Sequence, residues 1–144
     1  MGRKIVAKFI NCNENEVVFT SGTSMSINLI AYGYAFNHLK KGDEIILDEA
    51  EHASNVLPWF KAAEVTGAVI KYIPLNEDGS ITVDNLRKVI SNKTKIVAIA
   101  QVSNVLGYDI DIKEFAKVAH EHGVPLIVDN TFPTPFNCNP IKWG

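Results

Sequence analysis

The chain has 144 residues, of which 47% are hydrophobic, so it is long enough for one domain with a sizeable core. Its 14 basic and 16 acidic residues give a net charge of −2, which provides no electrostatic reason to expect nucleic acid or an anionic membrane as a partner. Cys12 and Cys138 lie far apart and outside any metal-binding spacing, so we expect a reducing compartment and no metal site. The N-terminus is too amphipathic for a signal peptide, and no apolar stretch approaches the roughly 20 residues that span a bilayer. We therefore expect a cytoplasmic protein with no membrane segment.

Helical and extended hydrophobic patterns alternate along the sequence. Residues 16–20 predict a strand, and residues 24–39 predict a helix because their apolar side chains recur near a 3.6-residue period. The later predicted elements are, in chain order, a strand in 43–49, a helix in 53–67, a strand in 68–75, a helix in 82–92, a strand in 94–102, a helix in 111–123 and a strand in 124–129.

The predicted strands are mostly apolar on both faces and are separated by helices. This pattern is typical of a parallel sheet that helices cover on both sides. We therefore predict one α/β domain over residues 1–144, with three layers (αβα) around a mainly parallel sheet. In such sheets the ligand site lies beyond the carboxyl ends of the strands. At those positions the sequence places the polar segments "TSGTS", "DEAEHASN", "QVSNVLG" and "VDNTF".

The first polar segment surrounds Gly22 and lies between a predicted strand and a predicted helix. Free backbone N–H groups and the helix dipole favour an anion such as phosphate at such a turn. Taken alone, an ordinary helix cap with a glycine turn explains the segment at least as well. Neither the GxxxxGK spacing of a P-loop nor a GxGxxG fingerprint occurs, so a nucleotide-binding module has only this turn in its favour.

Two later loops each offer one candidate side chain. His52 could stack on an aromatic ring or move protons, although a solvated loop histidine explains it equally well. No Cys or acidic residue stands at metal-ligand spacing from His52. Asn104 could exchange a hydrogen bond with a ligand, or it could form an Asx-turn.

Asp129 is the most informative single residue. It follows the apolar run of residues 126–128, and an unpaired carboxylate at the end of a buried strand is costly. We therefore expect it to meet a cation or a set of hydrogen-bond donors. No Lys or Arg adjoins it in the sequence.

The order of these motifs resembles that of fold-type-I pyridoxal-phosphate enzymes, and most of all the cysteine desulfurase and selenocysteine lyase group of class V aminotransferases. The resemblance extends from about residue 5 to residue 129. It is carried by the segments "FTSGTSMSINL", "GDEIILDEAEHASNVLPW", "IPLNEDGSI" and "VSNVLG".

The resemblance implies a role in binding pyridoxal phosphate for each candidate residue. Gly22 and Thr23 would hold the phosphate, and His52 would stack on the pyridine ring. Asn104 would bond near the phenolic oxygen of the ring. Asp129 would pair with the protonated ring nitrogen, which would supply the cation that the sequence lacks. Ser21 and Gln101 are less secure candidates.

The sequence departs from this group after about residue 123. The segment "VDNTFPTPFNCNPIKWG" resembles the Cys/Met-metabolism branch of fold type I, in which Thr131 would also contact the cofactor region. Recombination, a deliberate chimera or an unusual natural member would each explain the change.

The lysine that forms the Schiff base in this family stands in a stretch such as "SGHK" or "SxTK", which the sequence does not contain. Lys142 falls short of that position. The resemblance therefore implies part of a large, cofactor-binding domain without the small domain, with no catalytic residue and at most weak cofactor binding. The alternative is a non-catalytic α/β structural domain, engineered or recombined, with inherited site residues.

The resemblance also implies an order for the strands. The family order places the segments 68–75, 43–49, 94–102 and 124–129 side by side, with 16–20 at the far edge. The last of the four would then be an open apolar edge, and such an edge is a template for pairing. We therefore expect a homo-oligomer.

Overall fold

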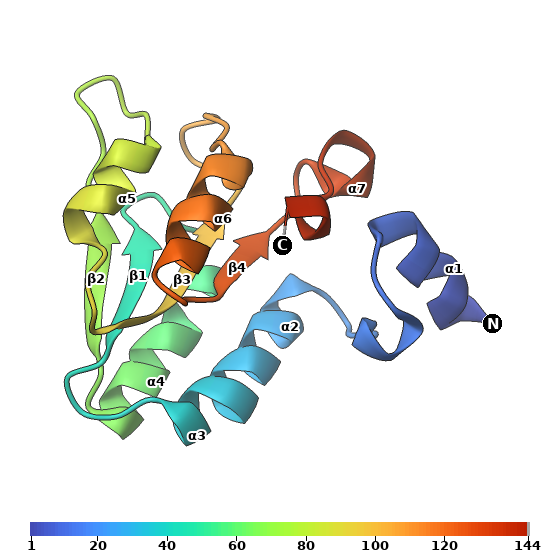
Figure 1. Cartoon of the computed structure of the whole chain (residues 1–144), viewed down its shortest axis with the longest axis horizontal. Helices are drawn as coiled ribbons and strands as arrows, with labels where there is room; N and C mark the ends of the chain where they lie inside the picture. Colours follow the sequence, from blue (N-terminus) through green and yellow to red (C-terminus); the bar gives the residue numbers. More distant parts are fainter. Residues whose placement is uncertain (144) are drawn as a thin grey trace.

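A four-stranded sheet forms the centre of the molecule. The computed structural model describes residues 1–143. Its strands are β1 (Glu44–Asp48), β2 (Val69–Ile73), β3 (Thr94–Ala100) and β4 (Leu126–Asp129), in the order β2-β1-β3-β4 (Figure 1). All three strand pairs are parallel. Both the parallel sheet and the expected order of these four strands are confirmed.

Helices cover both faces of the sheet. Alternate residues of the inner strands point to opposite faces, so Ile46 and Val97 contact one layer of helices while Ile45 and Ile96 contact the other. The first layer contains α5 (Val83–Val89) and α6 (Ile112–Glu121), and the second contains α2 (Thr23–Ile30) and α4 (Leu57–Thr66), as Figure 1 shows. The predicted αβα layering is therefore confirmed.

The remaining helical segments are short or lie at the two ends of the chain. The predicted helix in 24–39 is present as α2, which continues through a π-helical turn into α3. The remaining bounds are α1 (Gly2–Ile10), η1 (Glu14–Glu16), η2 (Ala31–Ala35), α3 (Phe36–His38), η3 (Ala53–Asn55), α7 (Thr134–Asn137) and η4 (Pro140–Trp143). Within residues 1–143, no helix is long and apolar enough to cross a bilayer.

Local sequence explains where α6 and α5 begin. The Asp111 carboxylate accepts a hydrogen bond from the Glu114 backbone N–H at 3.2 Å, which caps α6. Thr82 precedes α5 and forms a capping box with Asn85, whose Oδ1 accepts a bond from the Thr82 N–H at 2.9 Å. Each cap turns the chain from a loop into a helix that packs on the sheet.

The prediction of a strand in residues 16–20 is wrong. The 3₁₀ turn η1 ends at Glu16, and Val17–Thr20 run without regular structure and pair with none of the four strands. A strand needs a neighbour for its backbone hydrogen bonds. Val17 alone is buried, whereas Val18 and Phe19 are 68% and 59% exposed. The apolar composition of the segment therefore reflects a surface stretch rather than a buried strand.

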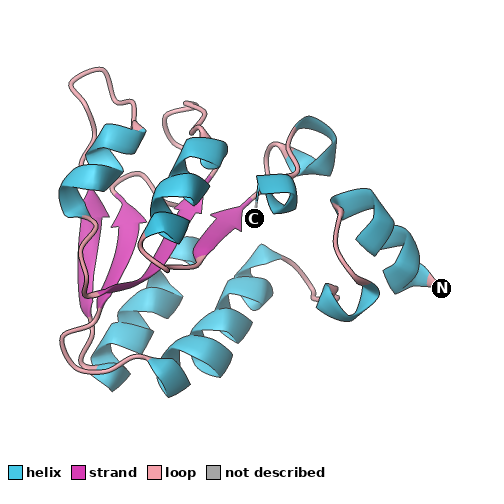
Figure 2. Cartoon of the chain, in the orientation of Figure 1, coloured by secondary structure: helices cyan, strands magenta, loops and turns pink. Residues whose placement is uncertain are grey.

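The two ends of the chain meet on one side of the sheet. The Phe9 and Phe136 rings make an edge-to-face contact with centroids 5.1 Å apart, and the Asn139 amide donates to the Phe9 carbonyl at 3.2 Å. Figure 2 shows α1 beside the C-terminal helical turns and away from the strands.

Candidate functional site

A cavity of about 410 Å³ opens at the carboxyl ends of β3 and β4. All six residues that the sequence predicted for one site line it, and they come from four separate segments of the chain. The lining consists of Ser21, Gly22, Thr23, Ser24, His52, Ser54, Ala100, Val102, Asn104, Asp129, Thr131 and Phe132. The structure therefore brings the predicted residues together, as expected for a parallel sheet.

The turn before α2 forms one wall of the cavity. Gly22 precedes the helix with φ 150° and ψ 176°, a backbone conformation that is almost restricted to glycine. A Cβ atom on Gly22 would meet no other atom within 4 Å, so the backbone here faces open space. Within residues 1–143 no side chain caps α2, and its first N–H groups therefore remain available to an anion.

A hydroxyl contact joins this turn to the loop after β4. The Thr23 and Thr131 hydroxyl oxygens are 2.8 Å apart. The Thr131 hydroxyl also donates to Asp129, so it must accept the proton of Thr23. The result is a chain of hydrogen bonds from the turn before α2 to the carboxylate at the end of β4.

Asp129 lies half-buried at the end of β4, opposite Ala100 of β3. One carboxylate oxygen, Oδ1, accepts both the Thr131 hydroxyl and the Thr131 N–H, the latter at 3.0 Å. Within residues 1–143 no Lys, Arg or His forms an ion pair with Asp129. The expected set of donors is therefore present on one oxygen, and Oδ2 makes no hydrogen bond with the described part of the chain.

His52 is exposed and lines the cavity. Its Nδ1 accepts a hydrogen bond from the Ser54 N–H at 3.1 Å and so caps η3. In its neutral form the ring then carries its proton on Nε2. The Ser54 hydroxyl in turn lies 2.7 Å from the Ser24 hydroxyl of α2. These contacts fix the loop that carries His52 to the helix that carries Gly22 at its start.

Asn104 is exposed in a turn that the Ser103 side chain stabilises. The Ser103 hydroxyl accepts bonds from the Val105 and Leu106 N–H groups at 3.2 and 3.1 Å, and Gly107 closes the turn with φ 73°. The Asx-turn considered for Asn104 is therefore absent, and its amide makes no hydrogen bond within residues 1–143.

Gln101 is buried behind the wall and does not line the cavity. Its Nε2 lies 3.4 Å from Asp109 Oδ1, and its Oε1 has no hydrogen-bond partner in residues 1–143. Ser24, Ser54 and Phe132 also line the cavity. All three lie in the polar segments that the sequence placed at the strand ends, but none was assigned a role there.

Two acids in the loop after β1 were also missed as a pair. Asp48 ends β1 and is only 2% exposed, and Glu51 follows three residues later. Burial and the nearby Asp48 charge raise the pKa of Glu51 to about 9, and burial raises the pKa of Asp48. The sequence shows three acids at this strand end, Asp48, Glu49 and Glu51, but not whether a cation lies near them in space.

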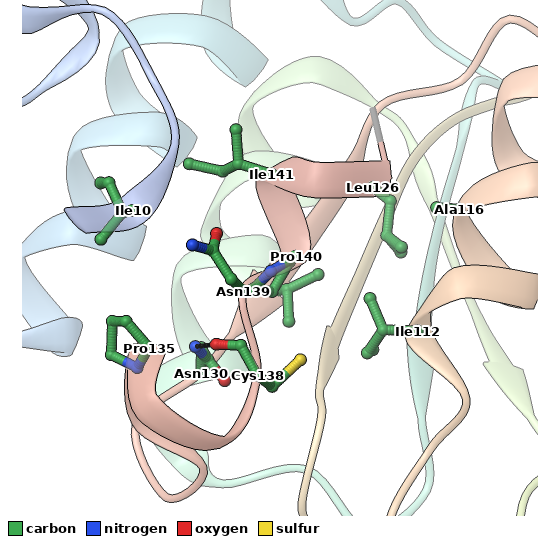
Figure 3. A pocket seen from close by; sticks show the side chains of 11 residues that line it. Ile10, Ile112, Ala116, Leu126, Asn130, Pro135, Cys138, Asn139, Pro140 and Ile141 are labelled. Carbon is green, nitrogen blue, oxygen red and sulfur yellow. Dashed lines mark hydrogen bonds between the residues drawn. The ribbon is translucent and has the colours of Figure 1, made fainter. Parts of the chain in front are cut away.

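A second, mostly apolar cavity of about 310 Å³ lies beside β4 and the C-terminal turns (Figure 3). Ile112 and Leu126 lie on one side of it and Cys138 and Asn130 on the other. Burial raises the pKa of the Cys138 thiol, so this thiol stays protonated and is a poor nucleophile. Within residues 1–143 no group of three or more His, Cys, Asp or Glu side chains could hold a metal ion.

Comparisons with known proteins match nearly the whole chain. The model of the family "Aminotransferase class-V" matches residues 1–132. A probable cysteine desulfurase of Halalkalibacterium halodurans is 45% identical over 134 residues, which are 92% of this chain and 33% of that protein. One from Staphylococcus epidermidis is also 45% identical over 134 residues, or 92% of this chain and 32% of that protein. The chain thus spans about a third of the length of these curated relatives.

Solved structures agree in fold. The cysteine desulfurase CsdA of Escherichia coli superposes with a TM-score of 0.91 at 36% identity, over 98% of this chain and 36% of that one. The apo cysteine desulfurase of Thermococcus onnurineus superposes with a TM-score of 0.82 at 38% identity, over 88% of this chain and 31% of that one.

Proposed function

Because the chain belongs to the aminotransferase class V family, we propose that its cavity at the ends of β3 and β4 binds pyridoxal phosphate, as the cofactor-binding part of a cysteine desulfurase-like enzyme. The observation that carries the proposal is the convergence of Gly22, His52, Asn104 and Asp129 on one cavity from four separate segments. The probable cysteine desulfurases among the relatives support the desulfurase class.

The residues present fit the chemistry of this cofactor. A phosphate needs N–H and O–H donors, and the uncapped start of α2 with Thr23 supplies them beside a glycine that leaves the backbone open. A protonated ring nitrogen needs an anion, and Asp129 has a carboxylate oxygen without a hydrogen bond. When bound, pyridoxal phosphate supplies an electron sink for an amino acid substrate.

Each side chain would then have a defined task. Asp129 would hold the proton on the ring nitrogen, and Thr131 orients that carboxylate through two hydrogen bonds. Thr23 joins Thr131 to the turn before α2 by a hydrogen bond. His52 would offer its ring for stacking, because its Nδ1 is fixed by the Ser54 N–H. The amide of Asn104 would donate to the phenolic oxygen.

We propose that this chain by itself holds the cofactor without a covalent bond. No lysine side chain lines the cavity within residues 1–143. Without such an amine there is no positioned nucleophile, so we expect no turnover of cysteine by the chain alone. Borohydride reduction followed by peptide mapping tests this, since a stoichiometrically labelled lysine would contradict it.

Titration of the chain with pyridoxal phosphate tests the proposal directly. We expect a saturable change in the absorbance of the cofactor, and weaker binding of pyridoxal, which lacks the phosphate that α2 would hold. Equal affinity for the two compounds would contradict the phosphate site. An absence of binding would favour the alternative of a structural α/β domain with inherited residues.

We also propose that residues 1–144 form one domain that self-associates. The supporting features are β4, which has a partner strand on one side only, and large exposed side chains nearby, Phe132 at 61% and Phe136 at 85%. The change of family branch near residue 123 stays a prediction.

A further inference from the structure

We infer that Glu51 is a positioning residue of the cavity, which holds the His52 loop against β3 as a neutral carboxylic acid that shares one proton with Asp48. Only the expected effect of Glu51 on cofactor affinity rests on the function proposed above. The shared proton itself concerns this chain without a ligand.

The first step is the proximity of the two acids. Asp48 is buried at the end of β1, and Glu51 is half-buried three residues later. Burial and the Asp48 charge raise the pKa of Glu51. The ion pairs within residues 1–143 are Lys61–Glu64, Lys71–Glu44 and Arg87–Asp84, and none involves either acid. Two neighbouring carboxyl groups that are removed from water and have no cation are costly to ionise together. We therefore place one proton between them.

The second step is the position of Glu51 within a network of buried donors. Its Oε1 accepts a hydrogen bond from the Ala100 N–H, and its Oε2 accepts one from the Asn55 amide at 2.8 Å. Asn55 is fully buried and accepts the Trp59 indole N–H at 3.0 Å. The Asp48 carboxylate accepts the Ala50 N–H at 2.6 Å. Glu51 therefore joins the loop after β1 to β3 from inside the protein.

The third step connects this network to the cavity. Ala100 lines the cavity and stands opposite Asp129 in the sheet register, and His52 follows Glu51 directly in the chain. The Glu51 side chain thus fixes the distance between the wall that carries His52 and the wall that carries Asp129. Any ring held between these two side chains depends on that distance.

The other titratable groups around the pair are acidic or neutral. The Glu49 charge raises the pKa of Asp48, and the buried Tyr108 hydroxyl has a raised pKa because of burial and because of both acids. None of them offers a compensating cation. Above a pH of about 9, where Glu51 ionises, we expect repulsion between the two carboxylates to displace the Glu51 side chain and with it the loop that carries His52.

Infrared spectroscopy of the cofactor-free chain tests the shared proton. We expect the carbonyl band of a protonated carboxyl group at pH 7, its loss as the pH rises past about 9, and its absence in Glu51→Gln. Glu77→Gln is the matched control, because Glu77 is exposed in a different loop and its substitution should leave the band unchanged. A wild-type chain without this band at pH 7 would overturn the inference, and that measurement needs no variant.

A nuclear magnetic resonance titration of His52 tests the positioning role without a ligand. We expect the His52 ring signals to shift as Glu51 ionises in the wild type and to show no such step in Glu51→Gln. Signals of His52 that stay constant while the infrared band disappears would show that Glu51 does not position this loop.

Cofactor titrations at several pH values then connect the two proposals. We expect the affinity of the wild type for pyridoxal phosphate to fall several-fold more between pH 7 and pH 10 than that of Glu51→Gln, because the amide stays neutral. Equal pH dependence would overturn the link to affinity. If no chain binds the cofactor, the proposed function fails, whereas the infrared and resonance experiments still decide the inference.

Discussion

The strand β1 begins and ends with a buried carboxyl group, and these two groups differ in their partners and in the direction of their pKa shifts. At the start, Glu44 accepts bonds from the Ser91 hydroxyl at 2.6 Å and the Thr94 hydroxyl at 3.2 Å, and it pairs with Lys71 at 3.2 Å. Burial by itself would raise the pKa of Glu44, but these hydrogen bonds and the Lys71 charge lower it overall. At the end, Asp48 and Glu51 meet no cation, and burial raises the pKa of both.

This difference indicates that the two edges of the sheet have different roles. The amino ends of the strands carry a charge whose partners are all within the chain, so that edge serves the fold. The carboxyl ends carry polar groups with bonds left over, such as Asp129 Oδ2 and the Asn104 amide. Polar groups without partners at this edge are available to a ligand.

Substituting Asp129 should produce the largest effect and sharpen the contrast. Asp129→Asn removes the negative charge that would face the ring nitrogen while keeping an oxygen for the Thr131 N–H. We expect the affinity for pyridoxal phosphate to fall roughly 30-fold or more, which corresponds to about 2 kcal/mol or more. The free energy of unfolding should change by about 1 kcal/mol or less. Absorbance titrations and urea unfolding measure the two quantities.

Glu44→Gln, at the start of β1, should lower the stability of the fold and leave cofactor affinity unchanged. Gln cannot accept from both hydroxyls as strongly, and it leaves Lys71 without its charge partner. We expect a loss of about 2 kcal/mol in the free energy of unfolding, moderated by the partial exposure of Lys71. Cofactor affinity should stay unchanged under conditions in which the variant is folded. A loss of affinity similar to that of Asp129→Asn would break the contrast between the two ends.

The free energy of unfolding should depend on pH in opposite directions for Glu51 and for Glu44. The unfolded chain releases the Glu51 proton near pH 4.5, whereas the folded chain keeps it up to a pH of about 9. Between these two pH values the folded chain holds more protons, so the free energy of unfolding falls as the pH rises. The slope is at most about 1.4 kcal/mol per pH unit. Glu51→Gln should flatten it.

Denaturant unfolding from pH 5 to pH 9 measures this slope. For Glu44, whose pKa is lowered, the sign is opposite, and its stabilising contribution is lost only in acid. A Glu51→Gln chain with the same slope as the wild type would show that Glu51 is ionised in the folded state.

The smallest effect on folding should come from the exposed aromatic side chains beyond β4. Phe136→Glu removes the ring contact with Phe9 and should change the free energy of unfolding by roughly 1 kcal/mol or less, yet weaken self-association. Phe60→Glu on α4 is a matched control, because Phe60 is also exposed but lies on a different helix. Light scattering at micromolar concentration compares the three chains. A wild type that is strictly monomeric would contradict the proposed self-association.

The sequence predicted most of what periodicity and strand ends determine. The four strands and their helices follow from hydrophobic period, and the polar segments that line the cavity follow from the rule that parallel strands present their carboxyl ends to one edge. The resemblance to fold-type-I enzymes was needed to select the six residues within these segments, Thr131 among them. The strand expected in residues 16–20 failed because an apolar run specifies an extended chain but not a partner for it. The Asp48–Glu51 pair was missed because its significance depends on the absence of a cation in space, which no local pattern reveals.

The hydroxyl contact between Thr23 and Thr131 has a consequence for the order of folding. It joins residues separated by 108 positions, so closing it requires most of the chain and carries a large loop-closure entropy. During synthesis Thr131 leaves the ribosome 108 residues after Thr23. The cavity therefore forms later than contacts between neighbouring elements, and a refolding experiment should detect burial of Trp59 before any capacity to bind a ligand.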